Sequence, residues 1–214
     1  MTATEHIRRL IGGVPEGRPF LLSDVVGKVA EEFGMERAAA RNLIQQELRK
    51  MLDGGSVIRC HRGVYRTAGK DSAGDACALS AEEACELYLF DLEGRRIGYC
   101  ADVLRETSGA GRRSVIVTNR RGSGTQPALA TEFGLTLVRP KTIVDDGNFE
   151  YLALLDSLSL TQDKGLSSKI AEKAFSYMGE RGLSLAELMG HASRSYPSDT
   201  VLLVASLCAI LQNR

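Results

Sequence analysis

The chain has 214 residues, with 27 basic and 27 acidic side chains, and its sequence pI is about 6.8. This balance excludes a uniformly basic coat for nucleic acid, and 43% hydrophobic and 25% charged residues are typical of a globular protein. The longest apolar run, residues 201–211, is shorter than a membrane span, so we expect no membrane partner. The chain does not start with a signal-peptide pattern, and its five cysteines form no C-x-x-C pair. Both features predict a cytoplasmic location.

Charge is unevenly distributed along the chain. Residues 1–70 hold 12 basic and 8 acidic side chains, whereas residues 71–105 hold 3 basic and 8 acidic ones. Between these two regions, residues 67–76 are small and polar and include two glycines, which is typical of a linker. The sequence therefore predicts two domains, residues 1–69 and 77–214.

The first domain contains the signals of three helices followed by a hairpin. Thr2 and Glu5 form a capping-box pattern, and apolar spacings predict a second helix from Ser23 to about residue 33. A third helix is expected over residues 36–52, with its core face at residues 40, 43, 44, 48 and 51. Residues 56–60 and 64–67 then read as two short strands around a tight turn at Gly63.

This order of elements is that of a winged helix-turn-helix, whose third helix enters the major groove of DNA. Asn and Gln side chains can pair with adenine and Arg with guanine, while basic residues on the hairpin can contact phosphates. The expected DNA-binding residues are Arg37, Arg41, Asn42, Gln45, Arg49, Arg59, Arg62 and Arg66. A winged helix that docks on protein remains the alternative, since any exposed helix face is polar.

The second domain reads as an α/β domain with a mixed sheet and a helical C-terminal tail, so the fold class of the chain is α+β. The sheet is expected within about residues 95–145 and the helices within about 148–213. Ser80 and Glu83 predict a capped helix that ends near residue 90. The strands are expected at residues 96–100, 114–118, 135–138 and 142–144.

Residues 112–141 contain six basic side chains against one acidic side chain, Glu132. They form a possible second surface for an anionic partner, or simply carry solvated loop charge. The basic residues are Arg112, Arg113, Arg120, Arg121, Arg139 and Lys141.

Catalytic and metal-binding signatures are missing from the sequence. It has no P-loop, nucleophile elbow, H-E-x-x-H or dinucleotide-binding pattern, and the adjacent Cys60 and His61 cannot complete a zinc site. We therefore expect no enzyme, no catalytic residues, no metal and no cofactor. An alternative is a metal-dependent nucleic-acid enzyme whose acidic site draws on a scattered set of carboxylates. That set comprises Asp91, Glu93, Asp102, Asp145 and Asp146.

Several short motifs, in this order and spacing, resemble AbiEi-type antitoxins of abortive-infection, type IV toxin–antitoxin systems. The motifs are Gly63-Val-Tyr65, Ile97-Gly-Tyr99, Ser114-Val-Ile-Val-Thr-Asn119, Leu137-Val-Arg-Pro-Lys141, Asn148-Phe-Glu-Tyr-Leu-Ala-Leu-Leu-Asp156 and Ser195-Tyr-Pro197. The likeness spans nearly the whole chain.

The resemblance implies a non-enzymatic autorepressor that binds double-stranded DNA in its own promoter region through the winged helix. Two copies would act together, which implies a homodimer on DNA. It also implies that the second domain counteracts a nucleotidyltransferase-like toxin. The alternative is an orphan transcriptional regulator whose second domain mediates dimerisation.

Overall fold

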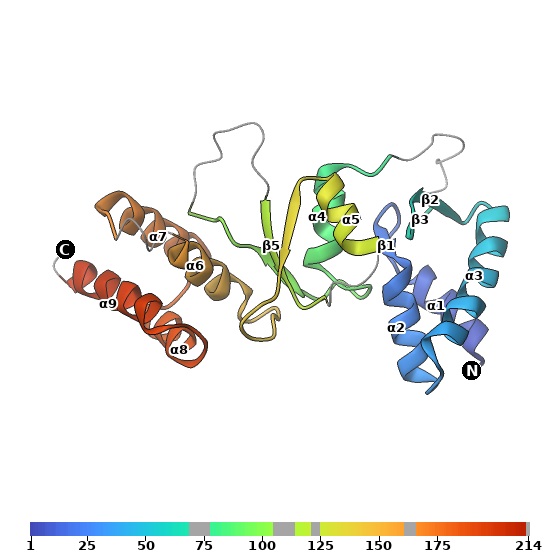
Figure 1. The fold of residues 1–214 in the computed structure, drawn as a ribbon, viewed down its shortest axis with the longest axis horizontal. Helices are drawn as coiled ribbons and strands as arrows, with labels where there is room; N and C mark the ends of the chain where they lie inside the picture. Colours follow the sequence, from blue (N-terminus) through green and yellow to red (C-terminus); the bar gives the residue numbers. More distant parts are fainter. Residues whose placement is uncertain (69–77, 105–113, 121–124, 161–165, 213–214) are drawn as a thin grey trace. The chain divides into compact units, whose positions relative to one another are not determined.

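The computed structural model describes residues 1–68, 78–104, 114–120, 125–160 and 166–212. It has the expected α+β class, with helices and two small three-stranded sheets in these ranges. The chain divides into two compact units, Met1–Arg95 and Arg96–Arg214, and each is described separately (Figure 1).

The first unit combines helices with an antiparallel sheet. Its sheet has the order β1-β3-β2, so the C-terminal hairpin strand β3 is central and β2 lies at an edge. The strands are β1 (Pro19–Leu21), β2 (Val57–His61) and β3 (Val64–Thr67). The helices are α1 (Ala3–Gly12), α2 (Leu22–Glu32), α3 (Arg37–Asp53) and α4 (Ala81–Leu89).

Local sequence signals set several of these boundaries. The expected capping boxes are confirmed: Thr2 and Glu5 open α1, and Ser80 and Glu83 open α4. In each box the hydroxyl accepts from the backbone of the glutamate, and the glutamate accepts from the backbone of the capping residue. Gly63 adopts a φ of 77° in the β2–β3 turn, a conformation that side chains with a Cβ rarely adopt.

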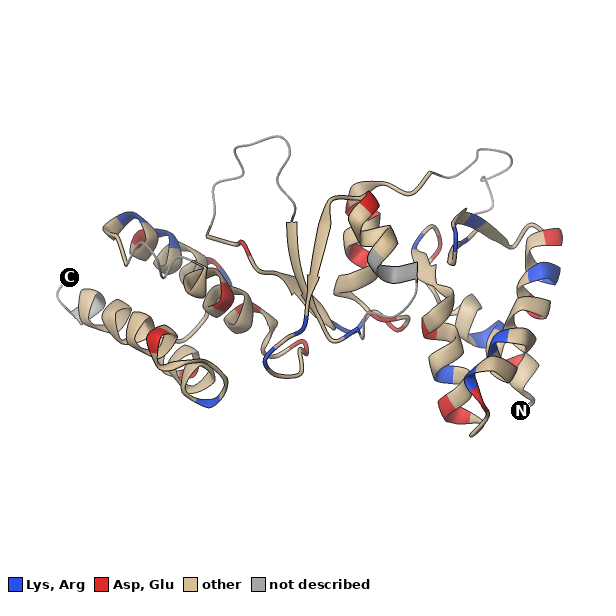
Figure 2. Ribbon diagram, in the orientation of Figure 1, with Lys and Arg blue, Asp and Glu red and all other residues tan. Residues whose placement is uncertain are grey.

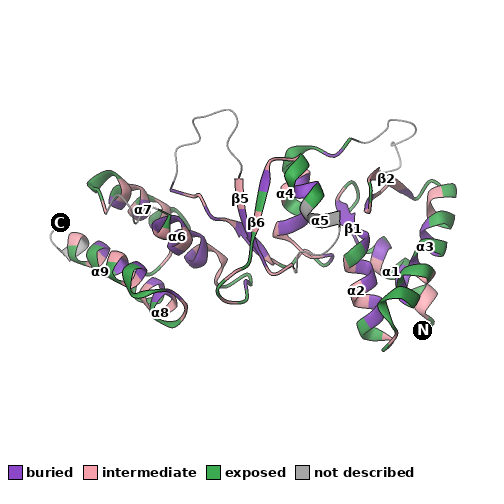
Figure 3. Ribbon diagram, in the orientation of Figure 1, coloured by how far each residue is buried: buried purple, intermediate pink, exposed green. Residues whose placement is uncertain are grey.

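Apolar faces of α1, α2 and α3 enclose the core of the first unit (Figure 3). The buried positions of α3 include Ala40, Ile44 and Leu48, as the helical period predicts. Leu43 and Met51 pack against this cluster while staying partly exposed. The face of α3 that carries these residues is therefore fixed by burial.

Residues 79–95 pack on the first unit, so the two units divide after Arg95 and not within residues 69–77, where the sequence placed the boundary. Leu92 is 7% exposed and belongs to the same apolar cluster as the first three helices. The Arg18 guanidinium lies 5.1 Å from the centre of the Phe90 ring, and Lys28 contacts Glu93. These long-range contacts do not depend on any local pattern in residues 77–95.

The second unit contains a mixed sheet of order β4-β5-β6. Its strands are β4 (Gly98–Cys100), β5 (Ser114–Thr118) and β6 (Leu135–Val138). Strand β5 pairs antiparallel with β4 and parallel with β6, and α5 (Thr125–Glu132) lies between β5 and β6 in the chain. Residues 142–144 are not a strand, and α5 was not expected from the sequence.

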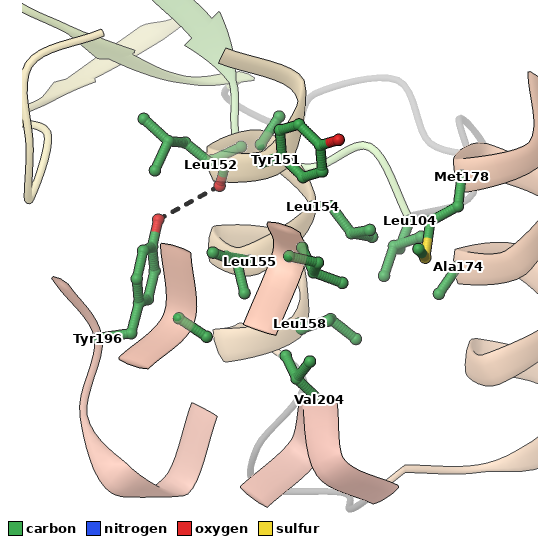
Figure 4. Packing of buried hydrophobic residues seen from close by; sticks show 14 of the residues in the cluster. Leu104, Tyr151, Leu152, Leu154, Leu155, Leu158, Ala174, Met178, Tyr196 and Val204 are labelled. Atoms are coloured by element: carbon green, nitrogen blue, oxygen red, sulfur yellow. Dashed lines mark hydrogen bonds between the residues drawn. The ribbon is translucent and has the colours of Figure 1, made fainter. Parts of the chain in front are cut away.

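The C-terminal part of this unit is helical, as predicted. It contains α6 (Phe149–Ser159), α7 (Ser168–Arg181), α8 (Leu185–Ser195) and α9 (Ser198–Gln212). Helix α6 is central to the packing, because Leu154, Leu155 and Leu158 are fully buried (Figure 4). The Tyr196 hydroxyl, at the start of the segment between α8 and α9, donates to the Leu152 carbonyl at 3.3 Å.

None of the helices in the described ranges combines the length and the apolar character needed to cross a membrane.

Candidate nucleic-acid interface

Helix α3 carries basic and amide residues at exposed positions, and its Lys and Arg positions are blue on the ribbon in Figure 2. All five expected positions on this helix are exposed, and they are Arg37, Arg41, Asn42, Gln45 and Arg49. Because an α-helix turns about 100° per residue, burial of Ala40, Ile44 and Leu48 directs Asn42, Gln45 and Arg49 outward. Arg37 and Arg41 lie at the edge of the buried face, near the N-terminal end of the helix, and are exposed there.

A buried carboxylate fixes α3 against α1. Glu47 is 2% exposed, and it accepts from the Arg8 guanidinium at 2.8 Å and from the Lys50 ammonium at 2.5 Å. The Lys50 hydrogen bond is the main cause that lowers the pKa of Glu47, with Arg8 adding to it against the opposing effect of burial. The rotation of α3 about its axis is thus fixed by an ionic contact as well as by the apolar core. No local pattern predicts this role, because Arg8 and Glu47 are far apart in the chain.

The β2–β3 hairpin presents two of its three arginines to solvent. Arg59 and Arg62 are exposed, Arg59 within β2 and Arg62 in the turn beside Gly63. The β2–β3 register shifts between Arg59 and His61, so one extra residue, Cys60, is accommodated on the edge strand. Such an irregularity bends the edge strand and redirects the residues at the end of the hairpin.

The structure brings α3 and β2 together around an open hollow of about 270 Å³. Its lining residues are Gln45, Leu48, Arg49, Leu52, Arg59 and Tyr65. Three expected DNA-binding residues from two elements therefore border one depression, and none of the six lining residues is acidic.

Arg66 differs from the other two hairpin arginines. Its guanidinium lies 2.5 Å from the Glu83 carboxylate of α4, and its side chain is 17% exposed. Strand neighbours alternate between the faces of a sheet, so Arg66 projects to the face opposite Tyr65 and Arg59. Because the Arg66 side chain is paired with α4 and mostly buried, it is not presented to solvent as Arg59 and Arg62 are.

The expected second basic surface is only partly described by the structure. Arg112, Arg113 and Arg121 lie outside the described residues. Arg120 is half-buried and Arg139 is exposed. Lys141 donates to the Asp156 carboxylate at 3.0 Å and lies 3.8 Å from the centre of the Tyr196 ring, so its charge is engaged within the second unit.

A polar network that the sequence did not predict surrounds Asp156, whose side chain is 14% exposed. The Tyr99 hydroxyl donates to Asp156 at 2.6 Å, opposite the Lys141 contact. Burial is the first cause that raises the pKa of both Tyr99 and Tyr196, and the charge of Asp156 raises both further. The four residues of this network all lie within the motifs that resemble AbiEi-type antitoxins, namely Tyr99, Lys141, Asp156 and Tyr196. Their presence in these motifs is the only feature of the sequence that could have pointed to the network.

Three of the five carboxylates considered for an acidic catalytic site, Asp91, Asp145 and Asp146, accept hydrogen bonds that stabilise the fold. Asp91 accepts from the backbone of Glu93 and from Arg95, which also lowers its pKa despite the opposing effect of burial. Asp145 accepts from the backbone of residues 147 and 148, and Asp146 accepts from the backbone of Arg96. Within the described part of the chain, no three His, Cys, Asp or Glu side chains gather to hold a metal ion.

Comparison of the chain with models of known families, with curated proteins and with solved structures gave no match.

Proposed function

We propose that the first unit is a winged helix-turn-helix that binds double-stranded DNA, with α3 in the major groove and the β2–β3 hairpin against the backbone. The single observation that carries the proposal is the row of exposed cationic and amide side chains on α3, continued by Arg59 at the shared hollow. Arg37, Arg41, Asn42 and Gln45 face the base edges, while Arg59 and Arg62 contact phosphates.

This proposal leaves Arg66 out of the interface because Glu83 already engages its guanidinium. A guanidinium recruited by DNA would first have to give up this partly buried ion pair. The free energy lost with the Arg66–Glu83 ion pair would reduce the gain from a new phosphate contact. Arg66 therefore holds α4 against the hairpin and leaves DNA contact to Arg59 and Arg62.

We further propose that the chain acts as an autorepressor and antitoxin of a type IV toxin–antitoxin system. The motif resemblance supports this role, and the structure adds that Tyr99, Lys141, Asp156 and Tyr196 from four of these motifs meet in one network. The second unit then counteracts a nucleotidyltransferase-like toxin. The chain works without a cofactor and without catalysis, as a homodimer on DNA in the cytoplasm.

The alternative is an orphan regulator whose second unit only dimerises. Helix α9 favours it, because Leu202 is 64% exposed and residues 200–212 carry no charged side chain. Adjacency of a nucleotidyltransferase-like reading frame would support the antitoxin, and co-expression with that frame would test neutralisation directly. Loss of toxicity only when the second unit is intact is the expected result.

The DNA-binding proposal is tested by fluorescence anisotropy of the full chain on duplex from its own upstream region and on scrambled duplex, across salt concentrations. Preferential binding of the upstream duplex, with affinity that falls as salt rises, is the expected result. Equal binding to both duplexes would contradict a sequence-specific repressor. No binding at low salt would make the first unit a protein-docking module.

A further inference from the structure

We propose that the hollow between α3 and β2 receives one phosphodiester of the DNA backbone, held jointly by Arg49 and Arg59. This inference rests on the proposed function and assigns a specific part of DNA to a specific place on the protein. It also changes the expected role of Arg49, which then fixes the register of the complex instead of reading a base.

The strand register directs Arg59 toward α3. Arg59 and Tyr65 are directly paired across β2 and β3, so their side chains share one face of the sheet. Tyr65 is 9% exposed and belongs to the apolar cluster that includes α3 residues, so this face is the one that α3 covers. Arg59 extends from the same face at the sheet edge and remains exposed.

The helical period directs Arg49 to the same place. Gln45 and Arg49 are four residues apart on α3, so they lie one above the other on one side of the helix. Both line the hollow with Arg59, and all three are exposed. By contrast, Glu47 lies on the buried side of α3 with Arg8, and its negative charge is already compensated.

The chemistry of the lining matches a sugar–phosphate unit. Arg49 and Arg59 offer guanidinium forks suited to phosphate oxygens. Leu48, Leu52 and the ring of Tyr65 provide apolar surface for the deoxyribose. With a volume of about 270 Å³, the hollow falls below the roughly 300–1,000 Å³ of sites for drug-sized ligands. Its size and openness favour a segment of a polymer over an enclosed small molecule.

Charge complementarity favours an anionic occupant, here a DNA phosphate, over an uncharged peptide. Two cations line the hollow without an acidic residue among its lining, so a phosphate is neutralised where an uncharged peptide would leave both guanidiniums partly desolvated. One phosphate between two guanidiniums also removes the repulsion that two nearby cations exert on each other.

The test is a double-substitution cycle in the full chain, using Arg49→Gln, Arg59→Gln and the double variant. Affinity for the upstream duplex and for scrambled duplex is measured by anisotropy at several KCl concentrations. If one phosphate is shared, either arginine alone still neutralises it, so each single variant keeps nearly the wild-type salt slope. The double variant then loses one phosphate contact, and the slope of log affinity against log salt becomes shallower by about 0.9.

A matched cycle uses Arg41→Gln on α3 and Arg62→Gln in the β2–β3 turn, which are both exposed but do not line the hollow. For this pair, the slope change of the double variant is the sum of the two single changes. All four positions are on the surface, so melting temperatures followed by circular dichroism should stay within about 2 °C of wild type.

Slope losses of about 0.9 for each single variant and about 1.8 for the Arg49–Arg59 double variant would overturn the shared contact. An unchanged slope in the double variant would overturn any phosphate contact at the hollow. Failure of the proposed function gives a different result, namely equal affinity of the wild-type chain for the two duplexes. The salt slopes of the variants can then still be measured on scrambled DNA. Absence of all DNA binding would overturn both proposals.

Discussion

The Tyr99 hydroxyl and the Asp156 carboxylate are 2.6 Å apart and connect β4 to α6 in the second unit. On the other side of the same carboxylate, Lys141 donates at 3.0 Å and covers the Tyr196 ring. Asp156 therefore joins a strand, a helix and the 139–141 segment through charge-assisted contacts. Such a network is sensitive to the loss of any one partner.

Substitution of Asp156 should destabilise the second unit more than substitution of Tyr99. Tyr99→Phe removes one hydrogen bond at a cost of about 1 kcal/mol, while Asp156→Ala leaves a buried hydroxyl and an ammonium without their acceptor, at a cost of roughly 1–3 kcal/mol. Urea unfolding, with hydrogen exchange of α6 peptides, measures both effects. The exposed Arg139→Gln is the control, and a loss there equal to that of Asp156→Ala would contradict the network.

Alkaline pH should weaken the second unit through Tyr99. Burial raises the pKa of Tyr99 above its ordinary value of 10.0, so the unfolded chain releases this proton at a lower pH than the folded chain does. Stability is then fully present below about pH 10 and falls as pH rises above it. Tyr99→Phe should reduce this fall in urea-unfolding experiments between pH 8 and pH 11. An identical pH profile in the variant would show that Tyr99 does not contribute.

The contact of Glu47 with Arg8 and Lys50 should make the first unit less stable in acid. Its lowered pKa means that the stabilisation is present above the ordinary value of 4.5 and is lost as pH falls. Glu47→Gln should lower stability at pH 7 on the order of 1 kcal/mol, because both cations are largely exposed and screened. Thermal unfolding at pH 7 and pH 3 measures this, and an equal loss at both values would contradict an ionic role.

Arg62 and Arg66 should separate binding from stability, although both are hairpin arginines. Arg62→Gln removes an exposed charge and should flatten the salt dependence of DNA binding by about 0.9 with little change in melting temperature. Arg66→Gln breaks the contact with Glu83 and should lower the melting temperature while leaving the salt slope unchanged. Anisotropy and circular dichroism on the same samples make the comparison. Equal slope changes would place Arg66 at the DNA after all.

Asn42 should affect specificity more than affinity. Its exposed amide near the middle of α3 can pair with adenine, and loss of a bidentate base contact costs about 1–3 kcal/mol of discrimination. Asn42→Ala should therefore reduce the ratio of upstream to scrambled binding and leave the salt slope unchanged. Anisotropy on both duplexes measures the ratio, with Arg62→Gln as the variant that should weaken both alike. A proportional loss on both duplexes by Asn42→Ala would contradict base recognition.

Local signals explain what the sequence predicted well. The two capping boxes, the turn at Gly63 and the exposed face of α3 each depend on residues within a few positions of one another. Because the interacting residues are close together in the chain, these features can be predicted without knowledge of the tertiary structure. The exposure of Asn42, Gln45 and Arg49 follows from this periodicity, whereas their role in DNA binding stays a prediction.

Contacts between distant residues explain what the sequence did not predict. Residues 142–144 are all β-branched, as in many strands, yet the Asn119 amide occupies the backbone N–H and carbonyl of Val144 at 2.9 and 2.7 Å. A neighbouring strand would otherwise pair with these groups. The Arg66–Glu83 pair and the burial of Leu92 join residues 79–95 to the first unit. No pattern within either segment reports these partners.

The irregularity at Cys60 also bears on whether two copies of the chain can pair through their edge strands. Strand β2 is an edge, and an edge strand offers free backbone groups to the edges of other molecules. The extra residue interrupts the regular spacing of those groups, and Arg59 and Arg62 place like charges where two such edges would meet. We therefore expect the hairpin that we assign to DNA to hinder aggregation by strand addition as well. Replacing its arginines should increase aggregation at high protein concentration, even in variants that fold correctly.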